Sequence, residues 1–204
     1  MRQVVAFGLV VAILGSPSSA RADSPARPKS LGVFELPDVD GKKLSSAAFD
    51  GKKALVLLFT STQCPECQRC LPQISAVAKD YEAKTVAVVA INPNGNEQDE
   101  LAAWVKDREV PFPTLRDADH ALADRLGIEI TPTVLVIDAG GAIRYRGRVD
   151  ATRMGEESTG ADLRAALDAV LDGRDVAAPE TPATGCAVRR REIAKSGDVT
   201  WAKH

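Results

Sequence analysis

The chain has 204 residues with 26 basic and 28 acidic side chains, which gives a formal net charge of −2. This balance argues against a nucleic-acid partner, because domains that bind nucleic acid carry a strong excess of positive charge. The length allows a single domain with a hydrophobic core, plus a tail.

The first residues predict a secretory signal peptide, residues 1–22. Arg2 precedes the apolar segment Val4–Leu14, and the small-residue pattern Ala20-Arg21-Ala22 follows it. The apolar segment is well short of the roughly 20 residues that cross a bilayer, so an uncleaved anchor is the weaker alternative. We therefore expect cleavage after Ala22, export to a periplasmic or other extracytoplasmic compartment, and no stable membrane insertion afterwards. Residues 23–30, with two prolines among small and charged residues, predict a linker.

Strand and helix signals alternate over residues 31–173, which predicts one α/β domain with parallel strands and right-handed crossovers. We expect a hairpin from Leu31–Leu36 and Lys42–Leu44, and further strands at Ala54–Thr60, Thr85–Ile91, Phe112–Leu115, Val134–Asp138 and Ala142–Val149. We expect helices at Pro65–Ala83, Glu97–Arg108, Asp119–Leu126 and Ala161–Leu171. Residues 174–204, with little apolar content, predict a tail that contains Cys186.

Two cysteines lie at the turn between the strand Ala54–Thr60 and the helix that follows it. In Cys64-Pro65-Glu66-Cys67, Pro65 suits the first helical position, so Cys64 is expected at the N-cap. Unpaired N–H groups and the helix dipole favour a thiolate there and can lower a thiol pKa from roughly 8.5 to about 3.5–7.5. The spacing predicts a redox dithiol in which Cys64 attacks and Cys67 resolves the mixed disulfide. A structural disulfide or half of a zinc site is the alternative, but a zinc site needs a second ligand pair that the chain lacks, so we expect neither a metal nor a cofactor.

The stretch from Leu55 to Pro72 resembles the active-site loop of the thioredoxin superfamily, in particular its exported TlpA-like and redoxin (AhpC/TSA, peroxiredoxin-like) branches. Pro72 lies where thioredoxins carry a proline in the active-site helix, and Ile130-Thr131-Pro132-Thr133 is similar to their cis-proline loop. The resemblance covers residues 31–173. It implies an α/β, thioredoxin-like fold, with a central mixed sheet flanked by helices, an N-terminal β-hairpin and a helical insertion before the cis-proline loop.

The same resemblance implies an activity. The chain would be a thiol–disulfide oxidoreductase that acts on protein thiols or disulfides and is recycled by an unidentified redox partner. Thr131 and Pro132 would bind the substrate strand, with the peptide bond before the proline in the cis form.

Departures from the family pattern leave two other functions open. Leu58 occupies the place where reducing thioredoxins carry a buried acid, which suggests slower or differently assisted resolution by Cys67. Ser61 suits the Ser/Thr position of peroxiredoxins, but Leu57 replaces their proline, so a thiol peroxidase with Cys64 as the peroxidatic cysteine is the runner-up. A copper- or metal-handling chaperone built on this scaffold is the third possibility, although no suitably placed histidine is evident.

One charge beside the dithiol and two further cysteines complete the candidate groups. The acidic Glu66 should destabilise the Cys64 thiolate, which predicts a reduction potential near that of the reducing thioredoxins. Cys70 shares a helix face with the resolving cysteine and is interpreted as a half-buried free thiol; a disulfide to Cys186, or a third ligand for a soft metal such as Cu(I), are the alternatives. Gly185, Cys186 and the basic residues after them are similar to the tails of some exported redoxin-domain proteins.

Overall fold

The computed structural model describes residues 27–152, 156–190, 192–193 and 199–200. The predicted signal peptide and residues 23–26 lie outside this range. The end of the predicted linker is part of the folded structure, because Lys29 and Leu31 form backbone hydrogen bonds with Ile143 and Gly141. Within the described ranges, no helix is both long enough and apolar enough to span a bilayer.

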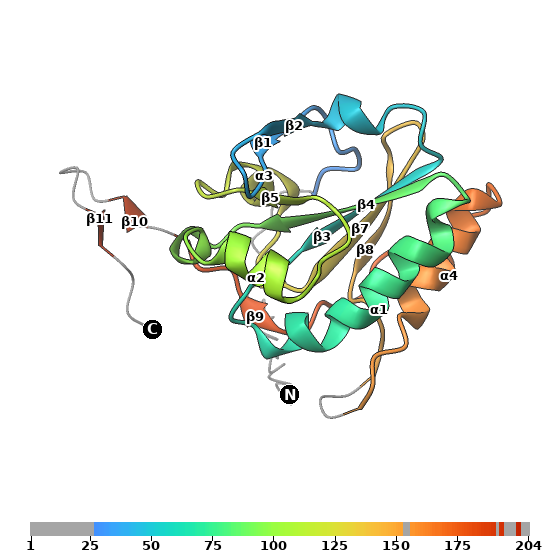
Figure 1. The fold of residues 1–204 in the computed structure, drawn as a ribbon. Helices are drawn as coiled ribbons and strands as arrows, with labels where there is room; N and C mark the ends of the chain where they lie inside the picture. The colour runs from blue at the N-terminus through green and yellow to red at the C-terminus, as the bar shows by residue number, and fades with distance from the viewer. Residues whose placement is uncertain (1–26, 153–155, 191, 194–198, 201–204) are drawn as a thin grey trace, which may run out of the picture.

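A five-stranded mixed sheet forms the centre of the fold, with the strand order β5-β4-β3-β7-β8 (Figure 1). Its strands are β3 (Ala54–Phe59), β4 (Val86–Asn92), β5 (Thr114–Arg116), β7 (Thr133–Asp138) and β8 (Ile143–Gly147). β3 pairs in parallel with β4, and β4 with β5, whereas β7 is antiparallel to both β3 and β8. β3 is therefore the middle strand, and every one of its residues is buried.

Helices cover both faces of this sheet, which is why the central strand is apolar without alternation. On one face, α1 (Pro65–Glu82) and α4 (Ala161–Leu171) pack over the even-numbered residues of β3 (Figure 1). On the other face, α3 (Ala121–Leu126) packs over the odd-numbered residues. The carboxyl end of the most buried strand thus leads directly into α1, which confirms the predicted strand-turn-helix.

The N-terminal hairpin forms, but its first strand begins later than predicted. β1 (Glu35–Pro37) pairs with β2 (Lys43–Ser45) in a two-stranded sheet of its own, and the 3-10 helix η1 (Ser46–Phe49) follows. Leu31 and Phe34, expected within the first strand, are instead buried against the α3 face of the central sheet. Burial of these two side chains competes successfully with strand pairing at this point.

The helical insertion between β4 and the cis-proline loop is present with shorter elements than predicted. It contains η2 (Gly95–Glu97), α2 (Leu101–Asp107), β5 and α3. The predicted helix begins at Leu101 and not at Glu97, because the preceding residues form a 3-10 turn around the buried Glu97 side chain. β5 begins after Pro113, which has no N–H to donate to a strand pair.

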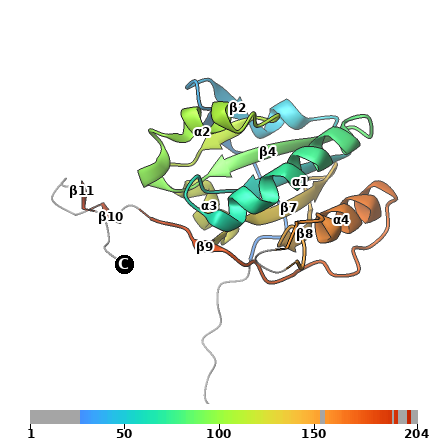
Figure 2. The same cartoon turned by 60° about the horizontal axis from the view of Figure 1, so that its bottom comes forward.

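The C-terminal tail is more structured than predicted. Residues 179–188, here called the strap, run along the domain from β8 to β6 (Ile130–Thr131), where β9 (Cys186–Ala187) pairs antiparallel with β6. β9 lies beside the N-terminal end of α1 both in Figure 1 and in Figure 2, where the bottom of the molecule is turned toward the viewer. β10 (Glu192–Ile193) pairs with β11 (Val199–Thr200). The strap escaped the sequence prediction because it is held mainly through its backbone, and its small and polar side chains show no apolar period.

Candidate active site

The two cysteines predicted to be redox-active lie where β3 runs into α1. Cys64 is the N-cap of α1 and Pro65 takes the first helical position, as predicted. This turn brings the N–H groups of Glu66 and Cys67 to the Cys64 sulfur. Both cysteines are buried free thiols, with 1% and 3% of their surface exposed. α1 continues through Pro72 to its end.

The two thiols differ strongly in acidity. The pKa of Cys64 falls to about 5, chiefly because the Cys67 thiol donates a hydrogen bond to the Cys64 thiolate; burial opposes this, and hydrogen bonds from the Cys186 thiol and the helix N–H groups add to it. Burial, together with the adjacent Cys64 thiolate, raises the pKa of Cys67 well above its ordinary value. Cys64 is therefore the more acidic of the two thiols, so the thiolate form is favoured at Cys64 and the protonated form at Cys67.

The peptide bond between Thr131 and Pro132 is cis, as the resemblance implied. This loop faces the dithiol, since the Cys64 sulfur lies 3.3 Å from the Thr131 carbonyl oxygen. The Thr133 hydroxyl closes the loop by donating to the Ile130 carbonyl oxygen at 2.6 Å. The structure thus brings Cys64, Thr131 and Pro132 together from segments far apart in the sequence.

The strap covers the cis-proline loop. At one end, Cys186 lies opposite Thr131 in the pairing of β9 with β6. At the other end, Arg146 of β8 forms backbone hydrogen bonds of 2.9 and 3.0 Å to the residues on either side of Glu180. Burial, and next the adjacent Cys64 thiolate, raises the pKa of Cys186 to about 11. Cys186 is therefore the thiol that neighbours Cys64 on the strap side.

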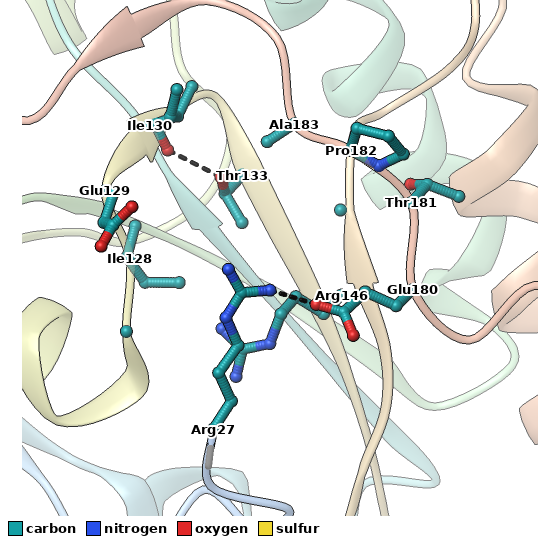
Figure 3. A pocket seen from close by; sticks show the side chains of 12 residues that line it. Arg27, Ile128, Glu129, Ile130, Thr133, Arg146, Glu180, Thr181, Pro182 and Ala183 are labelled. Carbon is teal, nitrogen blue, oxygen red and sulfur yellow. Dashed lines mark hydrogen bonds and ion pairs between the residues drawn. The ribbon is translucent and has the colours of Figure 1, made fainter. Parts of the chain in front are cut away.

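A cavity of about 380 Å³ lies between the strap and strands β7 and β8 (Figure 3). Arg146, 8% exposed, lines it; one terminal guanidinium nitrogen donates to the Leu126 carbonyl oxygen at 2.7 Å, and the other, Nη2, has no partner among the described residues. Burial lowers the pKa of Arg146. Arg27 and Glu180 point toward each other in Figure 3 and form an ion pair. With Glu129 also in its wall, the cavity has balanced charges, and its ion pair ties the strap to the N-terminal segment.

A buried carboxylate that the sequence reasoning missed lies behind the loop before the dithiol. Glu97 is 1% exposed and accepts hydrogen bonds from the Ser61 hydroxyl at 2.6 Å, the Thr62 N–H at 2.7 Å, and the side-chain amides of Asn92 and Asn94 at 2.8 and 3.1 Å. The Ser61 hydroxyl, predicted as an auxiliary of the peroxidase type, is thus engaged with Glu97. The signal that could have found this cluster is the run of asparagines and glutamate that begins at Asn92, the last residue of the buried strand β4.

The charge of Glu66 is paired, which corrects the sequence-based electrostatic argument. Its carboxylate accepts hydrogen bonds of 2.5 and 3.0 Å from the Arg69 guanidinium, which also lies 3.7 Å from the Asp150 carboxylate. A carboxylate neutralised within its own helical turn raises the pKa of a nearby thiol much less than a free one would. The destabilisation of the Cys64 thiolate by Glu66 should therefore be smaller than the sequence alone suggested.

Cys70 is fully buried rather than half-buried, with 2% of its surface exposed. Its sulfur lies 3.7 Å from both Glu66 Oε1 and Arg69 Nη2, and burial raises its pKa to about 12. It forms no disulfide with Cys186, whose neighbouring thiol is Cys64. Within the described ranges, no cluster of histidine, cysteine or acidic side chains is arranged to hold a metal ion.

The arrangement can carry out stepwise disulfide exchange. Cys64 supplies a thiolate and a good leaving group, and the cis-proline loop supplies a backbone edge beside it. Cys67 must lose its proton to attack, and the Thr60 hydroxyl and the Ser61 N–H both stabilise its thiolate. Once Cys64 is part of a mixed disulfide, its negative charge no longer opposes ionisation of Cys67. Leu58 is part of the apolar core under α1, so the buried carboxylate of this loop comes from the insertion and not from β3.

A five-stranded thioredoxin-like sheet with a Cys-x-x-Cys turn facing a cis-proline defines the class of this protein, a redoxin of the thioredoxin superfamily. The pattern of the AhpC/TSA family matches residues 29–146, more than half of the chain. The chain belongs to this family.

Individual relatives agree with this assignment. The thiol-disulfide oxidoreductase ResA of Halalkalibacterium halodurans is 29% identical over 110 residues, which cover 54% of this chain and 61% of ResA, less than two thirds of that relative. The crystal structure of a hypothetical protein from Sinorhizobium meliloti is similar with a TM-score of 0.75 and 35% identity, over 81% of this chain and 95% of that one. A secreted disulfide oxidoreductase of Mycobacterium tuberculosis, homologous to Escherichia coli DsbE, shares the fold, with a TM-score of 0.55 and 22% identity over 67% of this chain and 95% of that one.

Proposed function

We propose that this protein is an exported thiol–disulfide oxidoreductase that exchanges disulfides with proteins through Cys64 and Cys67. In the reducing direction, the Cys64 thiolate attacks a substrate disulfide and one substrate sulfur leaves as a thiolate. Cys67 then attacks the Cys64 sulfur of the mixed disulfide and releases the second substrate thiol; the oxidising direction reverses both steps. Thr131 and Pro132 would receive the substrate strand.

The observation that carries the proposal is the asymmetry of the dithiol. A cysteine whose pKa is about 5 lies against the cis-proline loop, and its partner two residues on has a raised pKa. The names of ResA and of the Mycobacterium tuberculosis protein describe the same chemistry. Export is supported by the signal-peptide pattern at residues 1–22 and by the secreted relative.

The low pKa of Cys64 also bears on the direction of exchange. A stabilised thiolate favours the reduced form, so the reduction potential should exceed the value of about −270 mV of thioredoxin and stay below the value of about −120 mV of DsbA. This expectation replaces the more reducing potential that the charge of Glu66 suggested.

A redox titration of residues 23–204 in glutathione buffers tests the proposal. Each sample would be quenched with acid and alkylated. Mass mapping would then give the redox state of each of the four cysteines. We expect a reversible Cys64–Cys67 disulfide with a potential between the two values above, retained in Cys70→Ala. If Cys64 forms no reversible disulfide with any thiol, the protein is not an exchange enzyme.

The competing function is a thiol peroxidase, which family membership and the low pKa of Cys64 favour. The hydrogen bond that the Ser61 hydroxyl donates to Glu97 argues against a peroxidase, because this hydroxyl is then not available to bind a peroxide. Reaction of the reduced protein with hydrogen peroxide and with glutathione disulfide at equal concentration separates the two. Faster formation of a sulfenic acid on Cys64 than of a glutathione adduct would favour the peroxidase.

A further inference from the structure

The strap fills the place beside the cis-proline loop that the proposed function gives to a substrate. β9 pairs with β6 in antiparallel register, as an added substrate strand would. Gly185 makes the approach possible, because a Cβ at this residue would lie 2.1 Å from the Thr131 carbonyl oxygen and 2.9 Å from Pro132 Cδ. Only glycine allows the strap to lie this close to the loop, and Cys186 follows it directly.

Cys186 and Cys64 both contact Thr131. The Cys64 sulfur lies 3.3 Å from the carbonyl oxygen of Thr131, while the Thr131 hydroxyl lies 3.4 Å from the carbonyl oxygen of Cys186. Cys186 is half-buried and lies opposite Thr131 in the pairing of β9 with β6, and each of the two thiols shifts the pKa of the other because they are close neighbours. The second sulfur that an exchange reaction needs is therefore already present, supplied by the chain itself.

The chain on the far side of Cys186 is also held in place. The Arg189 N–H donates to Asn94 Oδ1 at 2.7 Å, and the Arg189 guanidinium donates to Gln63 Oε1 at 2.9 Å. Asn94 belongs to the Glu97 cluster behind the dithiol loop, and Gln63 directly precedes Cys64. Contacts on both sides of Cys186 thus fix it relative to the nucleophile, which distinguishes it from a cysteine on a free tail.

We propose that Cys186 is a third redox-active cysteine that exchanges disulfides with Cys64, so that the strap is an internal substrate of the dithiol. When Cys64 and Cys67 are joined, the Cys186 thiolate attacks the Cys64 sulfur, the Cys64–Cys67 bond breaks, and Cys67 leaves as a thiolate that takes up a proton. The products are a Cys64–Cys186 disulfide and a Cys67 thiol. No external oxidant is needed, because the chain holds one disulfide before and after the step. The inference rests on the proposed exchange chemistry of Cys64.

The electrostatics of the site favour this step in the oxidised protein. Burial contributes most to the raised pKa of Cys186. The hydrogen bond with the Cys64 thiolate and the negative charge of that thiolate come next, whereas the positive charge of Arg189 lowers this pKa. Both effects of Cys64 vanish when Cys64 is part of a disulfide. Cys186 then becomes easier to ionise, at the moment when Cys64 is an electrophile.

A protein substrate must therefore replace the strap or react after it. The strap protects the Cys64–Cys67 disulfide from unselective external thiols, because the Cys186 thiol reaches the Cys64 sulfur before they do. A substrate that competes for β6 should be an extended strand, with a small residue before its cysteine, as Gly185 precedes Cys186.

The test uses residues 23–204 carrying Cys67→Ala, with glutathione disulfide as the probe. Cys64 attacks the probe and becomes glutathionylated; Cys186 should then displace glutathione and leave a Cys64–Cys186 disulfide, detected by mass mapping without reduction. Cys67→Ala/Cys70→Ala should form the same link, while Cys67→Ala/Cys186→Ala should retain glutathione on Cys64. A persistent glutathione adduct on Cys64 of Cys67→Ala, with Cys186 open to alkylation, overturns the inference.

A second variant leaves every thiol in place. Gly185→Ala should lift the strap from the loop and lower the share of Cys64–Cys186 relative to Cys64–Cys67 disulfide at least severalfold in the redox titration. Gly51→Ala is the matched control, because Gly51 also has a positive φ, of +82°, but a Cβ there meets nothing within 4 Å. An unchanged share in Gly185→Ala counts against the inference.

The two proposals fail separately. A reversible Cys64–Cys67 couple without any link to Cys186 leaves the oxidoreductase function standing and removes the internal substrate. The absence of any reversible disulfide on Cys64 removes the function itself.

Discussion

The effect of each acidic residue on the dithiol depends on its hydrogen-bond and ion-pair partners and not on how near it lies in the sequence. Glu66 lies between the two cysteines, yet Arg69 neutralises it. Glu97 is more than thirty positions from the dithiol loop, yet it accepts a hydrogen bond from the Thr62 N–H and supports the turn from which Cys64 projects. A buried carboxylate that accepts several hydrogen bonds is costly to remove, because each donor left behind is buried without a partner.

Glu97→Ala should therefore lower the free energy of unfolding by about 3 kcal/mol, since an unsatisfied buried donor costs about 1–3 kcal/mol and several are left. Glu97→Gln should cost less, because its amide oxygen still accepts. Denaturant unfolding of the reduced proteins measures both. Glu82→Ala, at the exposed end of α1, is the control and should change the stability by no more than about 0.5 kcal/mol. Equal stabilities of Glu97→Ala and the control would show that the cluster is not structural.

The strap is the element whose placement decides access to the site. It is anchored at β8 by the backbone of Arg146 and by the Thr181 hydroxyl, which lies 2.7 Å from the Tyr145 hydroxyl and accepts from the Arg148 N–H at 3.2 Å. The close approach again depends on a glycine, since a Cβ at Gly147 would lie 2.0 Å from Thr181 Oγ1 and 2.5 Å from its carbonyl oxygen. Backbone pairing of this kind opens locally when one anchor is disturbed.

Gly147→Ala should therefore release the strap from β8 while the central sheet stays folded. Amide hydrogen exchange should show the Thr181 and Val188 N–H groups, both hydrogen-bonded in the strap, exchanging at least tenfold faster, with the β3 amides unchanged. Gly141→Ala separates the clash from the backbone strain, because Gly141 also has a positive φ, of +81°, but is uncrowded. If the strap amides exchange at the same rate in both variants, the close approach of the strap to Gly147 is not what holds it in place.

For the whole molecule, the ionisation of one thiol links folding to pH and to redox state. Folding lowers the pKa of Cys64 to about 5, so its contribution to stability is present above the unfolded pKa, about 8.5, and is lost as the pH falls through about 5. Between these values the unfolded chain binds one more proton than the folded chain at this residue. Stability in the reduced state should therefore rise with pH across this window, by at most about 1.4 kcal/mol per unit.

Comparison of reduced wild-type protein with Cys64→Ser isolates this effect. The difference in their free energies of unfolding should grow by about 1 kcal/mol per pH unit between about pH 5.5 and 7.5. Cys70→Ser is the control: burial raises the pKa of Cys70 to about 12, so this thiol stays protonated throughout and its difference from wild type should be flat. A flat difference for Cys64→Ser as well would mean that its thiol is not ionised at neutral pH.

Much of the fold and the centre of the site were predictable from the sequence because their signals are local. The apolar run of β3, Pro65 at the first helical position and the bounds of α4 follow from neighbouring residues alone. The cis-proline loop was predicted through the resemblance of Ile130–Thr133 to a known loop. Errors in these elements were confined to boundaries, as at β1, where the burial of Leu31 and Phe34 overrode strand pairing.

By itself, the sequence determined that a dithiol lies at a strand-to-helix turn with Cys64 at the helix N-cap, because a helix N-terminus is made by consecutive residues. Only the tertiary structure decided which groups surround it. Glu66 is paired with Arg69 and does not face solvent as a free charge, Glu97 supports the dithiol loop, and the thiol beside Cys64 is that of Cys186 and not that of Cys70. The physical reason is that β9 joins β6 through backbone hydrogen bonds, for which every residue has an acceptor and every residue but proline a donor, and which leave no pattern in the side chains.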